Sequence, residues 1–167
     1  METPIDAMKH ALAALAKRWL QLHEEIAKHT QHLMELTQEV VPGLVQAMGI
    51  GADTAAQMLI TFGDNAHRIH SETAFAKMCG VYPLPASSGK TRRHRLNRGG
   101  NRQANASLFR VVIVRMRWHE PTKAYVARRQ AEGLSKREII RCLKRYLARE
   151  IFQGIRKSPL FLNIIES

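Results

Sequence analysis

Residues 85–102 read PASSGKTRRHRLNRGGNR, a basic, glycine-rich stretch between two segments that are rich in helix formers. No acidic residue occurs from residue 73 to residue 119. The basic residues of that region are Lys77, Lys90, Arg92, Arg93, Arg95, Arg98, Arg102, Arg110, Arg115 and Arg117. Because like charges repel one another in a folded protein, this concentration indicates a polyanionic partner, of which nucleic acid is the obvious example. We expect helical elements on both sides to hold a basic loop.

The composition sets the class of protein. The chain has 167 residues, 45% of them hydrophobic and 24% charged, and a net charge of +12. These values predict a globular domain with an appendage, and they favour nucleic acid as a partner. No apolar run approaches the roughly 18 residues that span a bilayer, and no signal pattern opens the chain, so we expect a cytoplasmic protein without a membrane partner. Cys79 and Cys142 lack a metal-binding spacing and are predicted to be buried thiols, with no metal ligands in this chain.

A heptad repeat of apolar residues covers the N-terminal segment, residues 5–40. Its positions are Ile5, Met8, Leu12, Leu15, Trp19, Leu22, Ile26, His29, Leu33, Leu36 and Val40. This spacing is typical of a coiled-coil helix, and so narrow an apolar stripe needs a partner helix. We expect a second copy, in a homodimer or higher oligomer of either orientation, with His29 as a polar position that sets the register. The alternative is a surface helix that packs on its own domain.

The segment 44–59 is similar to the helix-hairpin-helix DNA-binding motif, with Gly49-Ile50-Gly51 as the hairpin. Glycines at these positions would let the N–H groups at the start of the second helix approach a phosphate. Such contacts do not read base sequence. Asp53 would repel the phosphate, and the alternative is a tight corner between helices that binds nothing.

Capping residues predict the remaining helices, and they make the fold all-α. Ser71 is a candidate N-cap for a short helix that Gly80 ends. A helix from about residue 101 to residue 118 has an apolar surface nearly all round and should be the central core helix. Pro121 suits the first turn of the next helix, and Ser135 begins a capping box for the last one, to about residue 153. The expected division is a coiled-coil helix at 1–41, a compact helical domain at 42–157 and a tail at 158–167.

Four motifs occur in order along residues 44–153: GIG at 49–51, FAKMCGVYP at 75–83, SSGK at 87–90 and RGGNR at 98–102. Together they resemble the C-terminal transposase domain of the insertion-sequence family 110 and its 116 and 902 relatives. The resemblance implies a nucleophilic serine, a phosphoserine link to DNA, and strand exchange guided by a bridge RNA in a bacterial cytoplasm. It also implies a RuvC-like domain with acidic ligands for a divalent metal such as Mg²⁺. That domain is absent here, so we expect a C-terminal part that is inactive alone.

The family pattern Ser-x-Gly-Lys selects Ser87 as the nucleophile, with Ser88 as the alternative. Guanidinium groups fork onto phosphate oxygens and stay charged, so a basic loop suits a reaction in which phosphate gains negative charge. The predicted phosphate-binding residues are Lys90, Arg92, Arg93, Arg95, Arg98 and Arg102, together with Gly49 and Gly51. His94 is a weak candidate for a local base.

Other interpretations of the same residues remain open. Ser87 and its neighbours could form a plain flexible turn beside a non-specific basic patch. The chain could also be a non-catalytic helix-hairpin-helix module that binds DNA or RNA and dimerises. A third possibility is a coiled-coil adaptor between proteins, without affinity for nucleic acid.

Overall fold

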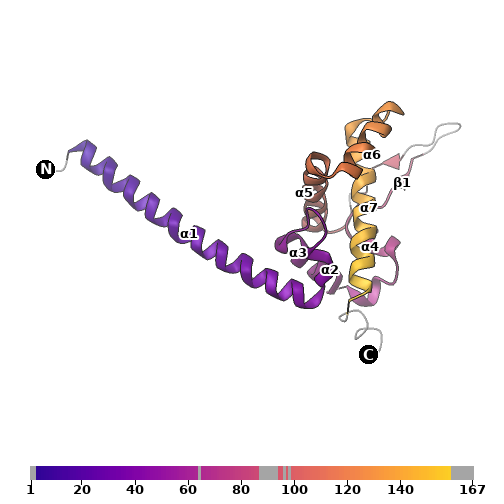
Figure 1. Ribbon diagram of the computed structural model, residues 1–167, viewed down its shortest axis with the longest axis horizontal. Coiled ribbons are helices and arrows are strands. Elements are labelled where there is room, and N and C mark those ends of the chain that lie inside the picture. Colours follow the sequence, from indigo (N-terminus) through magenta and orange to yellow (C-terminus); the bar gives the residue numbers. More distant parts are fainter. Residues whose placement is uncertain (1–2, 64, 87–93, 96, 98, 159–167) are drawn as a thin grey trace.

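The computed structural model describes residues 3–63, 65–86, 94–95, 97 and 99–158, and these residues are mostly helical. A long helix, α1 (Pro4–Val40), projects from a compact body that the later elements form (Figure 1). The body contains α2 (Pro42–Val45), α3 (Ala52–Gly63), the 3₁₀ helix η1 (Ala66–Arg68), α4 (Glu72–Met78), β1 (Leu84–Pro85), β2 (His94–Arg95), α5 (Arg102–Trp118), α6 (Glu120–Ala131) and α7 (Lys136–Arg156). The prediction of a helical protein is confirmed.

Helix α1 begins at a capping box and leaves most of its length uncovered. Thr3 and Asp6 satisfy each other's backbone N–H groups at its start. Its 37 residues make it about 55 Å long. Only the C-terminal end packs on α2 and α3, where Thr37 is buried. Further out, the apolar stripe is exposed: Leu15 is 67% and Ile26 is 64% accessible. The helix therefore does not pack along its own domain, which was the alternative.

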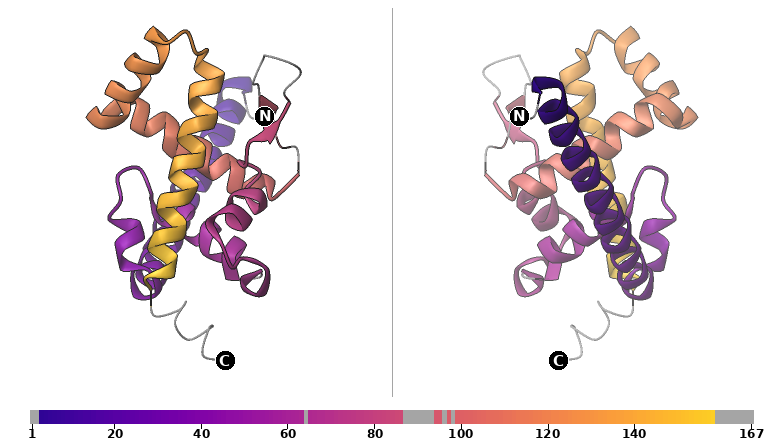
Figure 2. Two further views of the ribbon diagram at one scale, coloured as in Figure 1. Left: turned by 90° about the vertical axis from the view of Figure 1, so that its right-hand side faces the viewer. Right: turned by 90° about the vertical axis from the view of Figure 1, so that its left-hand side faces the viewer.

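The core of the body is built on three phenylalanines from different helices. Phe62 of α3, Phe75 of α4 and Phe152 of α7 lie with ring centroids 6.0 to 6.5 Å apart and tilted ring planes. All three are buried, and α5 adds Leu108 and Val111 to the same core. Helix α7 runs along the whole body and joins the α4 side to the α5 side (Figure 2).

Helix α5, predicted to be the central core helix, buries one face in the core and leaves the opposite face exposed. Asn101 is its N-cap, because its side chain accepts from the N–H groups of the second and third helical residues, and the helix begins within one residue of the predicted start. The outward face keeps large apolar side chains exposed, including Phe109 at 44% and Trp118 at 61%. Apolar composition alone did not indicate which face the rest of the body covers.

The last two helices follow their capping signals. Pro121 lies in the first turn of α6, and Gly133, with φ of +84°, occupies the turn before α7. The Ser135–Glu138 capping box starts α7, which continues three residues beyond the predicted end. Tyr146 falls on the apolar face of this helix by its sequence spacing, but it is 55% exposed. It packs edge-on against Tyr125 instead.

The two thiols differ in burial. Cys79 is fully buried, and burial raises its pKa to about 12. Cys142 is only half-buried and borders a cavity, so the prediction of a buried thiol is confirmed for Cys79 and wrong for Cys142.

Candidate nucleic-acid interface

The connection between α4 and α5 carries the basic stretch, and a short strand pair closes its base. Strands β1 and β2 are antiparallel, with Leu84 opposite Arg95 and Pro85 opposite His94. The prolines at 83 and 85 favour an extended path here, but the sequence did not predict the pairing. It brings the two ends of the loop at residues 86–93 together.

Most of the predicted site residues lie outside the described part of the chain. These are Ser87, Ser88, Lys90, Arg92, Arg93 and Arg98. Arg95 and Arg102 are described, and both side chains are exposed. Arg95 lies in β2, directly after the loop at residues 86–93, and Arg102 is the first residue of α5.

A close contact between two backbone segments holds the end of α4 against the start of α5. Gly100 has φ of +98°, and a Cβ atom there would lie 2.5 Å from the Met78 oxygen and 2.6 Å from the Gly80 nitrogen. Gly80 has φ of +65°, and its Cβ would lie 2.7 Å from the oxygen of Gly99. The Asn101 N–H donates to the Met78 carbonyl at 2.6 Å. Only glycine permits two backbones to approach this closely at positive φ. The end of α4 and the start of α5 are therefore held together.

The segment at 49–51, predicted to be the hairpin of a helix-hairpin-helix motif, lies in a turn between α2 and α3 that packs on α5. Gly49 has φ of +80°, and a Cβ there would lie 3.4 Å from methyl groups of Val111 and Val114. Gly51 is exposed, and a Cβ there would meet nothing within 4 Å. Asp53, in the first turn of α3, pairs with Arg110 at 2.9 Å. This pairing offsets the negative charge that was expected to repel a phosphate.

Arg115 anchors this turn. It is bound to Glu150 through two hydrogen bonds of 2.7 Å, and its Nε donates to the Met48 carbonyl at 2.7 Å. Only 12% of the Arg115 side chain is exposed, so these bonds hold the turn against the body from a largely buried position. It is therefore structural, although the sequence places it in the basic region.

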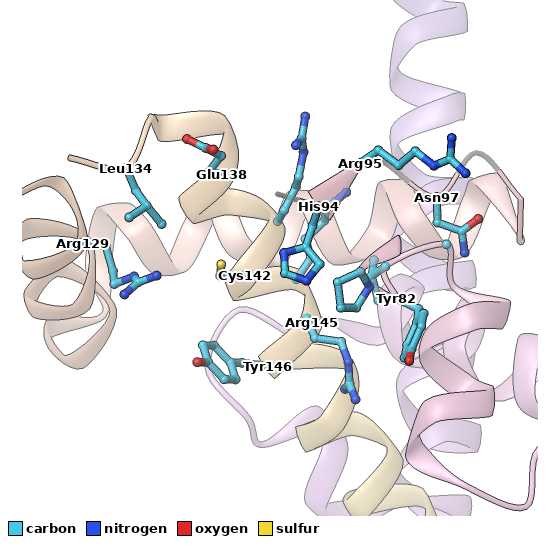
Figure 3. A pocket seen from close by; sticks show the side chains of 15 residues that line it. Tyr82, His94, Arg95, Asn97, Arg129, Leu134, Glu138, Cys142, Arg145 and Tyr146 are labelled. Carbon is cyan, nitrogen blue, oxygen red and sulfur yellow. The ribbon is translucent and has the colours of Figure 1, made fainter. Parts of the chain in front are cut away.

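A cavity of about 510 Å³ lies between the loop base, the segment after α4, and helices α6 and α7 (Figure 3). Its charged lining residues are Arg95, Arg129, Arg141, Lys144, Arg145 and Glu138. Sequence reasoning singled out Arg95 alone of these, because the others lie in α6 and α7, at least 34 residues later in the chain. Figure 3 shows the His94 ring between Tyr82 and Tyr146 along the cavity.

Lys144 is a buried cation at this cavity. Lys144 is only 7% exposed, and its Nζ atom donates to the Asn105 Oδ1 atom at 2.9 Å. Asn105 in turn donates to the carbonyl oxygens of Cys79 and Gly80, at 2.9 and 3.2 Å. Burial, and then the charge of Arg141, lower the pKa of Lys144. The lysine is thus tied to the same backbone that the glycine contact fixes.

Two further observations concern metals and membranes. In the part of the chain that the structure describes, no three His, Cys, Asp or Glu side chains are placed to share a metal ion. None of its described helices has the length and hydropathy required to cross a bilayer.

Comparison with known sequences gives the family of the chain. The profile of the transposase IS116/IS110/IS902 family matches residues 43–127, about half of the chain, and the chain belongs to this family. A relative in Streptomyces coelicolor, the insertion element IS110 uncharacterized 43.6 kDa protein, is 27% identical over 121 residues. The match covers 72% of this chain and 30% of that relative, so the chain corresponds to less than a third of its length.

Proposed function

We propose that this chain is the DNA-binding, catalytic-serine part of an insertion-sequence transposase. The family gives the reaction class. The observation that carries the proposal is the anchoring of the loop that contains Ser87. Its ends meet in the β1–β2 pair, and the glycine contact between Gly80 and Gly100 holds the flanking helices. A loop anchored in this way could present a hydroxyl group and several guanidinium groups to one phosphate.

The proposed step is a transesterification at a DNA phosphate. The Ser87 Oγ atom bonds to phosphorus while the bond from phosphorus to a sugar oxygen breaks. The serine proton passes to a base, and the leaving sugar oxygen takes up a proton. The resulting phosphoserine link keeps the ester for rejoining with a second strand. Arginines of the loop would offset the charge that develops on the non-bridging oxygens.

The base and a divalent metal are expected from an acidic RuvC-like domain. The described residues of this chain do not fit a metal, since they bring no group of three ligands together. His94, at the loop base, is exposed and is a candidate for proton transfer only if the DNA reaches it.

Strand exchange tests this proposal in a protein that joins this chain to a family RuvC-like domain. We expect Ser87→Ala to abolish exchange and Ser88→Ala to retain it, because only one hydroxyl group can attack the phosphate. Full activity in both variants would exclude a nucleophile at this pair of residues. A defect in Ser88→Ala alone would move the nucleophile by one position.

The alternative function is a non-catalytic module that binds DNA or RNA and dimerises. The exposed stripe on α1 favours dimerisation, because residues such as Leu12, Leu15 and Ile26 are each more than 60% accessible and would be covered by a second α1. Both functions require the chain alone to bind nucleic acid. The logarithm of the association constant should fall with log salt at a slope of about −0.9 per phosphate neutralised. Binding that does not depend on salt would contradict both.

A further inference from the structure

The cavity beside the loop base has an excess of positive charge. Five of its lining side chains are basic and one, Glu138, is acidic. Glu138 accepts from the Ser135 N–H in the cap of α7, so its charge serves the helix start. Arg129 pairs with Glu132, and Arg145 pairs with a glutamate of α4.

Arg95, Arg141 and Lys144 form no ion pair with any carboxylate in the described ranges. The first two are exposed at the rim, whereas Lys144 is buried. An ammonium group has three N–H donors, and the Asn105 side chain accepts one of them. Burying a cation against a neutral amide is costly unless a further partner compensates it. An anion in the cavity would supply that partner.

The size and position of the cavity point to a nucleic-acid strand. A volume of about 510 Å³ lies within the range of small-molecule sites, roughly 300 to 1,000 Å³. Arg95 belongs both to the cavity lining and to β2, where the basic loop returns to the body. A strand held by the loop would therefore pass the cavity. The rings of Tyr82, His94 and Tyr146 border it and offer surfaces for stacking bases (Figure 3).

We propose that this cavity is a nucleotide-binding subsite, which takes one nucleotide of a single strand with its phosphate against Lys144 and Arg141. The inference rests on the proposed function, since it names where part of the nucleic acid binds. It assigns a binding role to α7 and places the subsite at some distance along the sequence from the Ser87 loop. Lys144 links phosphate binding to the glycine contact at the end of α4, because its partner Asn105 holds the carbonyl groups of Cys79 and Gly80.

Calorimetric titration of the full chain with the 5′-phosphorylated dinucleotide pdTdT tests the subsite. We expect saturable binding that is about ten-fold weaker for the unphosphorylated dinucleotide, because the terminal phosphate makes charge-assisted hydrogen bonds. Arg141→Ala should weaken binding of pdTdT about ten-fold. Arg137→Ala is the matched control: Arg137 is also exposed, lies one turn earlier on α7 and does not line the cavity. It should change affinity by less than about two-fold.

Lys144→Met keeps the length of the side chain and removes its charge, and it should abolish binding of pdTdT in a chain that circular dichroism shows to be folded. If that variant does not fold, the comparison of Arg141→Ala with Arg137→Ala decides. Equal losses in those two variants would overturn the subsite, because only net charge would matter. Absence of pdTdT binding would also overturn it.

Two further titrations separate the sources of the ligand and the two proposals. Binding of pUpU as tight as that of pdTdT would indicate that the phosphate is recognised, and tighter binding would assign the subsite to RNA. A long DNA duplex that binds with steep salt dependence, while pdTdT does not bind, would overturn the subsite and leave the proposed function intact. Failure of both ligands would contradict the two together.

Discussion

Gly100→Ala tests how the basic loop is anchored, because it changes a single atom at the glycine contact. The new Cβ would lie 2.5 Å from the Met78 oxygen, 2.6 Å from the Gly80 nitrogen and 2.8 Å from the Lys77 oxygen. All three are backbone atoms, so no side-chain rotation can relieve the overlap. The ends of α4 and α5 must move apart instead.

The magnitude follows from the groups that would be displaced. A non-glycine residue at positive φ costs about 1–2 kcal/mol. Separation of the backbones would weaken the hydrogen bond from Asn101 to Met78 and disturb the cap of α5, at roughly 1 kcal/mol each. We therefore expect Gly100→Ala to lower the free energy of unfolding by about 3–4 kcal/mol.

Gly133→Ala is the matched control. Gly133 also has a positive φ, +84°, but a Cβ there would meet nothing within 4 Å. It should cost only the conformational term, about 1–2 kcal/mol. Urea unfolding of both variants, followed by circular dichroism, measures the difference. Equal losses of stability would refute the argument that close backbone approach, rather than glycine flexibility, holds the base of the loop.

Three other predictions concern the rest of the molecule. Leu15→Glu on the exposed stripe of α1 should weaken self-association more than ten-fold in sedimentation equilibrium, since burial of a leucine contributes roughly 1.5–3 kcal/mol. Ala13→Glu, off the stripe, should leave self-association unchanged. Equal effects of the two variants would contradict pairing through this face. At pH 8 the raised pKa keeps the Cys79 thiol protonated, so iodoacetamide should modify Cys142 and spare Cys79 until the protein unfolds. Rapid labelling of both thiols in the native protein would contradict the burial of Cys79. Arg115→Lys keeps the charge but loses the paired carboxylate bonds, and it should lower the free energy of unfolding by roughly 1–2 kcal/mol; an unchanged urea midpoint would show that the anchor contributes nothing.

The sequence predicted the helix starts well, because capping is a local property. Ser71 and Ser135 are N-caps as expected, and each accepts from an N–H group three residues later. The exposed outer face of α5 and the exposed Tyr146 were not predicted. Whether an apolar side chain is covered depends on elements far along the chain, which helical periodicity does not specify.

The candidate site was predictable only in part for the same reason. The basic loop was evident as a run of charge, and Arg95 was singled out within it. The cavity was not evident, since Arg141 and Lys144 look like ordinary solvated positions of an amphipathic helix. Their role depends on the packing of α7 against the loop base and on Asn105, 39 residues from Lys144. The predicted roles of Ser87 and the loop arginines lie outside the described residues and stay predictions.

The most direct measurement of the central claim is to identify the atom that becomes linked to DNA. A nicked suicide substrate would be incubated with this chain joined to a family RuvC-like domain, and the covalent complex would be digested and sequenced by mass spectrometry. Our account predicts a nucleotide attached through phosphate to Ser87, and no adduct in Ser87→Ala. Strand exchange that proceeds without a protein–DNA adduct, or an adduct on a residue outside the loop at 86–93, would contradict it.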